Sequence, residues 1–171
     1  MKRIFIALYL VIGILAKSKA NQVDTAYIST ASLHRFDGTW EYTDDKITFK
    51  IVLKTEKVYN TIYNNYVDFV IGHHLYIKDG KEMQNSIGKK ASLENGYFAN
   101  KQISKNVLRF TFHDQGKSNS GHAIVELLPN GTLSWELKDL EGMRIVSKGK
   151  NLDKLDHNFY VPTKLILTKV K

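Results

Sequence analysis

The feature that most constrains the fold is a hydrophobic pattern of period two. Within residues 36–54, "FDGTWEYTDDKITFKIVLK", apolar residues occupy every second position from Ile47 to Leu53, and most residues between them are polar. Successive side chains of a β-strand point to opposite faces, so this alternation predicts a strand with one buried face. The preceding residues predict a short partner strand, and the resulting hairpin directs Trp40 and Phe49 into the same interior.

The same period continues along the chain. Further strands are predicted at residues 66–77, 83–87, 107–113, 122–128, 132–138, 142–147 and 164–170. Asn130-Gly131 separates two of them, and this dipeptide tolerates the positive φ angles of a tight hairpin turn. We therefore predict an all-β fold, an antiparallel meander of 8–10 strands that forms a β-barrel or a strongly curved sheet.

The first twenty residues differ from the rest of the chain. Lys2 and Arg3 precede an apolar run of about thirteen residues, which is the length of a signal-peptide core and too short to span a bilayer. Small residues at Ser18 and Ala20 predict cleavage after Ala20. We therefore expect an exported protein, periplasmic or extracellular, with a signal peptide at 1–20, an N-terminal arm or linker at 21–35 and one barrel-like domain at 36–171.

Charge and cysteine content exclude several classes of protein. The leader carries four cations and no acidic residue, so its removal lowers the net charge from +8 to +4. The remaining lysines are dispersed, which argues against nucleic acid as a partner. The chain has no cysteine, so disulfides, thiol enzymes and thiolate metal sites are excluded. We expect no membrane span after signal removal, and a monomer.

Few residues suggest catalytic chemistry. If a hairpin loop joins residues 113 and 122, His113 and His122 lie opposite each other and form a weak candidate for a metal site. With Asp114 they are the group that a metal-dependent enzyme would use. The chain has no G-x-S-x-G elbow and no P-loop. We therefore predict a protein without catalytic residues or cofactors.

A second candidate site is the predicted interior. Six aromatic residues fall on predicted inward faces: Trp40, Tyr42, Phe49, Phe110, Phe112 and Trp135. An eight-stranded barrel has room for packed side chains or for one small ligand. The pattern leaves both alternatives open, a filled core or a ligand pocket.

Several motifs together resemble a known family. These are "FDGTWEY", "ITFKIVLK", the tyrosine-rich strand around Gly72, and "LLPNGTLSWEL". They resemble an uncharacterised domain-of-unknown-function family of small exported proteins from Bacteroidota, over roughly residues 33–170. The resemblance implies a secreted or periplasmic all-β protein with no assigned activity.

A weaker resemblance links the chain to lipocalin-like barrels. Those barrels carry a G-x-W motif on the first strand, here Gly38-Thr39-Trp40. Their last strand supplies an arginine that stacks over the tryptophan. Here the only cations of the last strand are lysines, and the resemblance points to Arg144, one strand earlier, as the substitute for the arginine.

These observations favour an exported, non-catalytic β-barrel binding protein. Its partner is a small apolar ligand or a protein at the barrel mouth, and the candidate ligand-binding residues are the six inward aromatics with Arg144. An alternative is a cell-surface structural or interaction module that uses a sheet edge. A metal-dependent enzyme is a further alternative.

Overall fold

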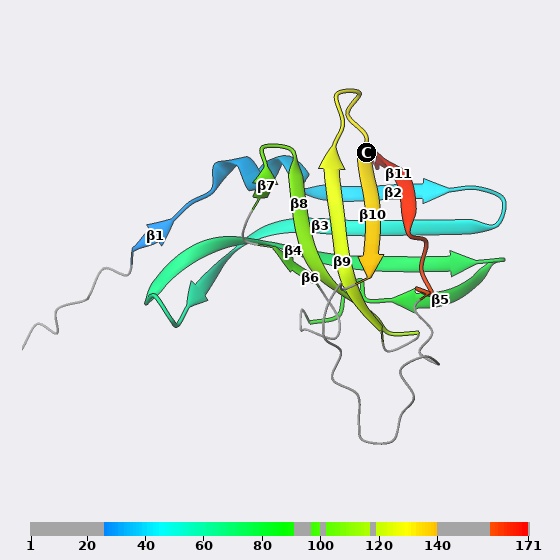
Figure 1. Cartoon of the computed structure of the whole chain (residues 1–171), viewed down its shortest axis with the longest axis horizontal. Coiled ribbons are helices and arrows are strands. Elements are labelled where there is room, and N and C mark those ends of the chain that lie inside the picture. The colour runs from blue at the N-terminus through cyan, green and yellow to red at the C-terminus, as the bar shows by residue number, and fades with distance from the viewer. Residues whose placement is uncertain (1–25, 91–96, 100–101, 117–118, 140–157, 171) are drawn as a thin grey trace, which may run out of the picture.

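The computed structural model describes residues 26–90, 97–99, 102–116, 119–139 and 158–170. These residues form one short 3₁₀ helix, η1 (Ala31–Phe36), and eleven strands (Figure 1). The strands are β1 (Tyr27–Ile28), β2 (Gly38–Thr43), β3 (Ile47–Asn60), β4 (Asn65–Lys78), β5 (Lys81–Asn85), β6 (Tyr97–Ala99), β7 (Gln102–Ser104), β8 (Val107–Asp114), β9 (Asn119–Leu127), β10 (Leu133–Asp139) and β11 (Lys164–Lys169).

The strands form one continuous, strongly curled sheet. Its order is β1-β4-β3-β2-β11-β10-β9-β8-β7, and β5 and β6 also pair with β4. In Figure 1 the strands β2 to β4 run across the strands β8 to β11, with the core between the two halves. The sheet forms a half-barrel, which confirms the predicted all-β, strongly curved fold. The strand predicted at 142–147 lies outside the described residues.

Local sequence accounts for the hairpins. β3 and β4 stay in register from Ile47↔Lys78 to Asn60↔Asn65, and the ladder has no bulge at Gly72. The turn that follows β4 places Asp79 and Gly80 at φ angles of 49° and 74°, as a two-residue hairpin turn requires. The Asn130-Gly131 turn joins β9 to β10, as the sequence predicts.

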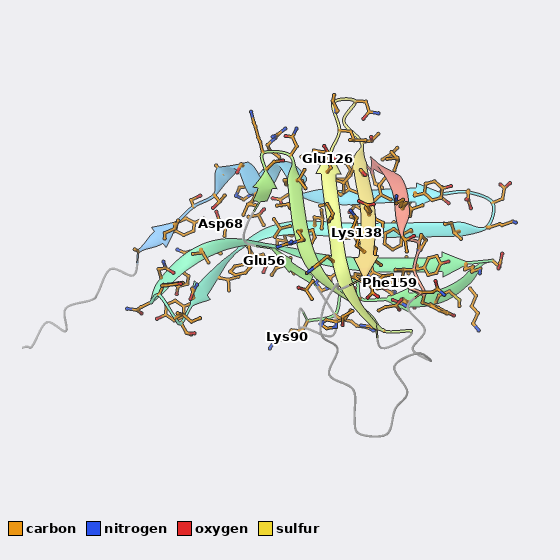
Figure 2. All side chains as sticks on the ribbon, viewed as in Figure 1. Glu56, Asp68, Lys90, Glu126, Lys138 and Phe159 are labelled. Carbon is orange, nitrogen blue, oxygen red and sulfur yellow. The ribbon has the colours of Figure 1, made fainter. Side chains whose placement is uncertain are left out.

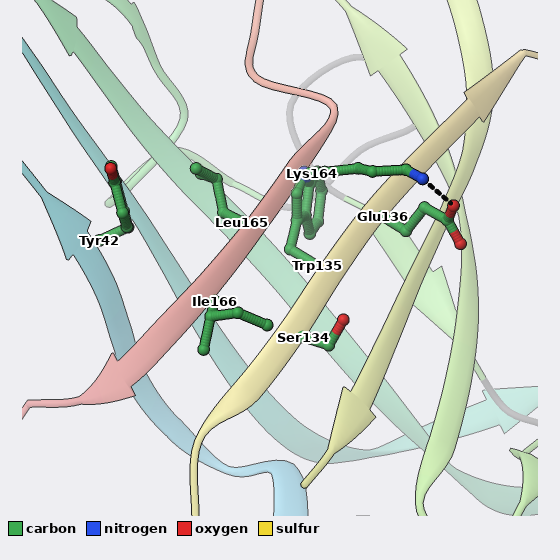
Figure 3. Close-up of a pocket in the computed structure, with 7 residues that line it drawn as sticks. All are labelled: Tyr42, Ser134, Trp135, Glu136, Lys164, Leu165 and Ile166. Carbon is green, nitrogen blue, oxygen red and sulfur yellow. Dashed lines mark ion pairs between the residues drawn. The ribbon is translucent and has the colours of Figure 1, made fainter.

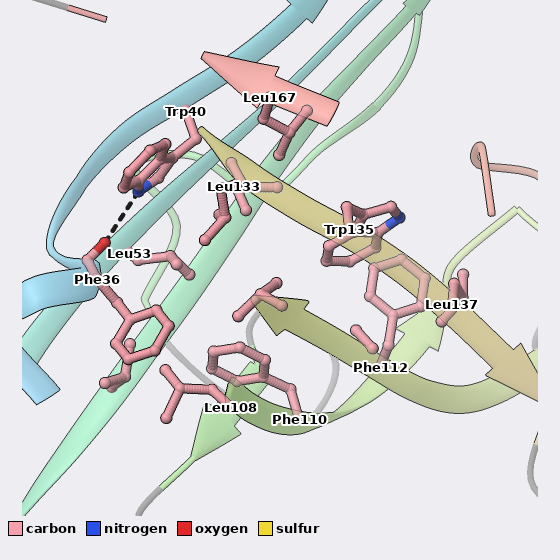
Figure 4. Packing of buried hydrophobic residues seen from close by; sticks show 14 of the residues in the cluster. Phe36, Trp40, Leu53, Leu108, Phe110, Phe112, Leu133, Trp135, Leu137 and Leu167 are labelled. Carbon is pink, nitrogen blue, oxygen red and sulfur yellow. Dashed lines mark hydrogen bonds between the residues drawn. The ribbon is translucent and has the colours of Figure 1, made fainter. Parts of the chain in front are cut away.

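One hydrophobic cluster fills the space between the two halves of the sheet (Figure 4). Alternate residues of the predicted strands point into it, including Phe49, Phe110 and Trp135. The inner positions of β8 and β10, and those of β3 from Phe49 to Leu53, are buried, so the period-two pattern located the core face of these strands correctly.

The helix η1 closes one end of this core. Leu33 and Phe36 are both fully buried, so the residues before β2 dock more tightly than the polar pattern of the predicted arm indicates. Arg35 donates from Nη1 to the side-chain oxygen of Asn106 at 2.8 Å, in the turn between β7 and β8. η1 therefore connects the first half of the sheet to the second.

Candidate functional site

The predicted aromatic set forms the centre of the packed core. The rings of Phe49 and Trp135 lie 5.1 Å apart, and those of Phe112 and Trp135 lie 5.7 Å apart. Trp40 and Phe110 belong to the same buried cluster, while Tyr42 packs against its edge. The five buried rings thus contact one another or their aliphatic neighbours, and of the six aromatics Tyr42 alone is left partly open to solvent. Arg144 lies outside the described residues.

A groove opens where β2 and β11 part. Only two pairs join these strands, Thr168↔Glu41 and Lys169↔Trp40. Beyond them the strands diverge and leave an open groove of about 570 Å³. We call it the β2–β11 groove, and Figure 3 shows the residues that line it. They are Tyr42, Ser134, Trp135, Glu136, Lys164, Leu165 and Ile166.

The walls of the β2–β11 groove combine apolar and charged side chains. Ile166 is 50% exposed, and Trp135 forms the floor while its Nε1 donates to the carbonyl of Pro162 at 3.0 Å. At the rim Glu136 contacts Lys138 at 3.2 Å and Lys164 at 3.3 Å. These ammonium groups, first Lys138, hold the pKa of Glu136 below its ordinary value of 4.5. The rim therefore carries an ionised carboxylate beside two cations.

Backbone groups of β11 also face the β2–β11 groove. The N–H of Val170 donates to the carbonyl of Thr39 at 2.9 Å, so even-numbered residues at this end of the chain point their backbone groups toward β2. The N–H of Leu137 donates to the carbonyl of Thr163, so odd-numbered residues point toward β10. By this alternation the backbone N–H and C=O groups of Ile166 face the groove.

The G-x-W motif has a cation above its tryptophan. The Nζ of Lys169, in the last strand, lies 5.1 Å from the centre of the Trp40 ring. A Cβ at Gly38 would lie 2.5 Å from the Cε of Lys169, so the glycine leaves room for the lysine. Trp40 Nε1 donates to the carbonyl of Phe36 at 2.9 Å (Figure 4). Lysine thus occupies the position for which the lipocalin pattern uses arginine.

A buried polar chain crosses the interior, and sequence reasoning missed it. Gln84 on β5 accepts a hydrogen bond from His74 Nε2 at 2.9 Å and donates to Asp114 Oδ1 at 2.6 Å. Asp114 also accepts from the backbone N–H groups of Gly116 and Tyr160. We call this set the polar bridge: His74, Gln84 and Asp114. It joins β4 and β5, at one end of the curled sheet, to β8 near the other.

The polar bridge is enclosed. His74 is 3% exposed and Asp114 is 1% exposed, and His74 also lies against Phe112 with ring centres 5.2 Å apart. Burial lowers the pKa of His74 from its ordinary value of 6.5, although Gln84 and Asp114 act in the opposite direction. His74 is therefore neutral at pH 7, and the bridge holds strands together instead of meeting solvent.

The two histidines of the metal hypothesis share a face but are not directly opposite. The register pairs His113 with Ser120 and Thr111 with His122, so the histidines are diagonal neighbours on the outer face of β8 and β9. The ring of His113 hydrogen-bonds the Ser120 hydroxyl through Nδ1 at 2.7 Å. Within the described ranges, no group of three or more His, Asp or Glu side chains is placed to hold a metal ion.

No helix in the described part of the chain is long and apolar enough to cross a membrane.

The fold and the β2–β11 groove define the class of this protein: an all-β half-barrel whose single sheet separates between β2 and β11. The chain belongs to a family of unknown function, DUF6705, whose model matches residues 1–170. No curated protein and no solved structure matches it. The resemblance to a domain-of-unknown-function family is thus confirmed, while the origin in Bacteroidota and the lipocalin resemblance stay predictions.

Proposed function

We propose that this protein is an exported, monomeric, non-catalytic binding protein whose ligand occupies the β2–β11 groove. The observation that carries the proposal is the separation of β2 from β11 beside the buried aromatic core. At that point Tyr42, Leu165 and Ile166 surround an open space next to Trp135. Its volume, about 570 Å³, lies within the range of small-molecule sites.

The lining residues indicate the chemistry of the ligand. An aromatic or aliphatic body fits against Tyr42 and Leu165, because burial of apolar surface supplies most of the affinity in such sites. A polar or anionic group at one end would meet Lys164, whose ion pair with Glu136 lies at the rim. We therefore infer a small, mostly apolar ligand with one polar group.

The non-catalytic part of the proposal is supported by the placement of the polar bridge. His74 and Asp114 are the buried titratable residues that the bridge joins, and both lie inside the protein away from the β2–β11 groove. A general acid or base must come within hydrogen-bonding distance of its substrate. An enclosed pair does not meet this requirement.

Two measurements test the proposal. Native mass spectrometry of protein purified from an exporting host is expected to show a co-purifying small molecule and a mature chain that begins at Asn21. In a second assay the aromatic probe 1-anilinonaphthalene-8-sulfonate is expected to bind the wild type and to bind Ile166→Glu about tenfold more weakly, because the substitution places a charge on the apolar wall. Thr111→Glu, on the outer face of β8, is the matched control. Equal probe binding by Ile166→Glu and wild type would contradict the proposal.

A sheet-edge interaction module is the second candidate function, and the backbone groups of Ile166 favour it. An extended peptide can add to such an edge by main-chain hydrogen bonds. A lysine-flanked octapeptide of alternating valine and threonine is the probe, and slower hydrogen exchange at Ile166 is the expected result. Ile166→Pro removes the N–H that faces the groove and is expected to abolish binding of the peptide in a titration with a fluorescently labelled copy. Unchanged exchange with the peptide in excess would exclude strand addition.

A further inference from the structure

The far end of the β3–β4 hairpin extends beyond the core. In Figure 1 it projects past β8 at the side of the molecule that carries β1. Figure 2 marks Glu56 and Asp68 near the point where it leaves the core. The pairing of β3 with β4 continues in register to the end of the hairpin. Within the described residues, none of the strands β7 to β11 pairs with this end.

This end concentrates the exposed apolar surface of the protein. Eight large hydrophobic residues are exposed in the described chain, and five of them lie here: Tyr27, Ile28, Tyr59, Ile62 and Tyr63. At the apex Ile62 is 83% exposed and Tyr63 is 74% exposed. Concentrated exposed apolar surface of this kind marks an interaction site. We call these five residues and Tyr66 the tyrosine tip.

Three tyrosines form a row across neighbouring strands of the tip. Tyr59 pairs with Tyr66, Tyr66 pairs with Tyr27, and the rings of Tyr59 and Tyr66 lie 5.2 Å apart. Lys57 Nζ lies 4.5 Å from the ring centres of both Tyr27 and Tyr66. The ammonium group is therefore held at the base of the tip, at the level of the ring row.

The apex contains no charge, and the backbone N–H groups of its two most exposed residues are hydrogen-bonded within the turn. Residues 58–67, "VYNTIYNNYV", include no Asp, Glu, Lys or Arg in a chain that is 25% charged. The N–H groups of Ile62 and Tyr63 both donate to Asn60 Oδ1, at 3.0 and 3.3 Å. The Tyr59 hydroxyl donates to Asn64 Oδ1. Ile62 and Tyr63 can therefore enter an apolar medium without carrying unpaired backbone N–H groups of their own into it.

Behind the apex, the acidic side chain nearest to the tip is already paired. Asp68 is buried and accepts hydrogen bonds from Tyr27 Oη at 2.6 Å and from the Thr30 N–H at 2.8 Å. Burial raises the pKa of Asp68, but these hydrogen bonds outweigh it and hold the pKa below its ordinary value. Asp68 therefore stays ionised, and these hydrogen bonds hold its charge inside the protein behind the exposed apex.

We propose that the tyrosine tip inserts into the interfacial layer of a lipid bilayer. Ile62 and Tyr63 would enter the acyl boundary, and the tyrosine row would lie at the headgroups, where amphipathic rings are favoured. Lys57 would then meet lipid phosphates, as a lysine at a membrane interface does.

The first experiment measures binding to phosphatidylcholine vesicles by co-sedimentation. It uses protein purified from an exporting host, so that wild type and variants share the same N-terminus. Wild type is expected to bind, and Ile62→Asp is expected to reduce the partition coefficient about tenfold or more, because a charge replaces the most exposed apolar side chain. Val170→Asp, an exposed apolar residue outside the tip, is the matched control and is expected to bind like wild type.

A second readout locates the inserted residue. Tyr63→Trp places a fluorophore at the apex, and its emission is expected to shift to the blue and to be quenched by lipids brominated on the acyl chain. Val170→Trp is expected to show neither effect. This measurement does not involve the β2–β11 groove, so its failure leaves the proposed function standing.

Three outcomes would overturn the lipid proposal. One is the absence of vesicle binding by wild type. Another is binding that needs anionic lipid, disappears in about 0.5 M salt because the salt screens surface charge, and is unchanged in Ile62→Asp. The third is dimerisation in sedimentation experiments that Ile62→Asp abolishes, with no vesicle binding, which would assign the tip to a second copy of the chain.

Discussion

Replacing Gln84 with methionine removes the side chain that connects the two ends of the curled sheet. Gln84 bonds His74 on β4 at 2.9 Å and Asp114 on β8 at 2.6 Å, and it is 6% exposed. Methionine has nearly the same length, so it fills the same space without either hydrogen bond. The substitution therefore isolates the contribution of the polar bridge from that of packing.

The expected loss follows from the two bonds. A hydrogen bond to a charged acceptor contributes about 1.5–3 kcal/mol and a neutral one about 1 kcal/mol, and partners left unpaired inside the protein add about 1–3 kcal/mol. The more apolar methionine side chain offsets about 1 kcal/mol of this. We expect the free energy of unfolding to fall by about 3–6 kcal/mol, and Tm to fall by about 9–18 °C.

Urea unfolding followed by tryptophan fluorescence measures this change, because both tryptophans lie in the core. Lys81→Met, at the exposed start of the same strand, is the matched control and should change stability by less than about 0.5 kcal/mol. Gln84→Glu sets a carboxylate beside Asp114 and should destabilise the fold more at pH 8 than at pH 5. A loss below about 0.5 kcal/mol for Gln84→Met would refute the bridging role.

Three further predictions follow from single contacts. Because burial lowers the pKa of His74 below 6.5, the unfolded state binds the proton first, so stability should fall as the pH drops below 6.5. The slope reaches at most about 1.4 kcal/mol per pH unit, and it should be smaller in His74→Gln when urea titrations at pH 5 and 7 are compared. Gly38→Ala forces a side chain onto a φ of 136° and displaces Lys169, so we expect a loss of about 2 kcal/mol in urea titrations, against less than about 1 kcal/mol for Lys169→Met. Leu33→Ala should cost about 3 kcal/mol by the same measurement because Leu33 is fully buried, while Ile28→Ala at an exposed position should be nearly neutral.

Much of the fold could be predicted because strand periodicity is a local property. The alternation around Phe49 and Phe110 identifies the buried face of β3 and β8 without any knowledge of their partners. The Asn130-Gly131 turn likewise fixes a hairpin through its own backbone preferences. Very short strands such as β1 and β7 have too few residues to show a period, so the structure contains more strands than the sequence predicts.

The candidate site depends on contacts between distant residues, and local patterns do not encode them. Gln84 and Asp114 are 30 positions apart, and neither position is marked by its neighbours as buried and polar. In η1 the two buried residues, Leu33 and Phe36, are three positions apart and lie among polar residues. Two residues are too few to show a helical period, so the pattern does not indicate Leu33 as part of the core. The cation that lies above Trp40 is Lys169, whereas the lipocalin pattern specifies arginine and so points to Arg144, which lies outside the described residues.

Two local sequences explain why the sheet separates between β2 and β11. After β2, Asp44 Oδ1 accepts the N–H groups of Lys46 and Ile47 at 2.8 and 2.7 Å, so the turn into β3 is completed without β11. Before β11, the carbonyl of Pro162 accepts Trp135 Nε1, which ties the incoming chain to β10. Each strand is thus held by its other neighbour where the two strands part. The proposed ligand would therefore enter the β2–β11 groove without any opening of the half-barrel, which is the behaviour expected of a largely preformed binding site.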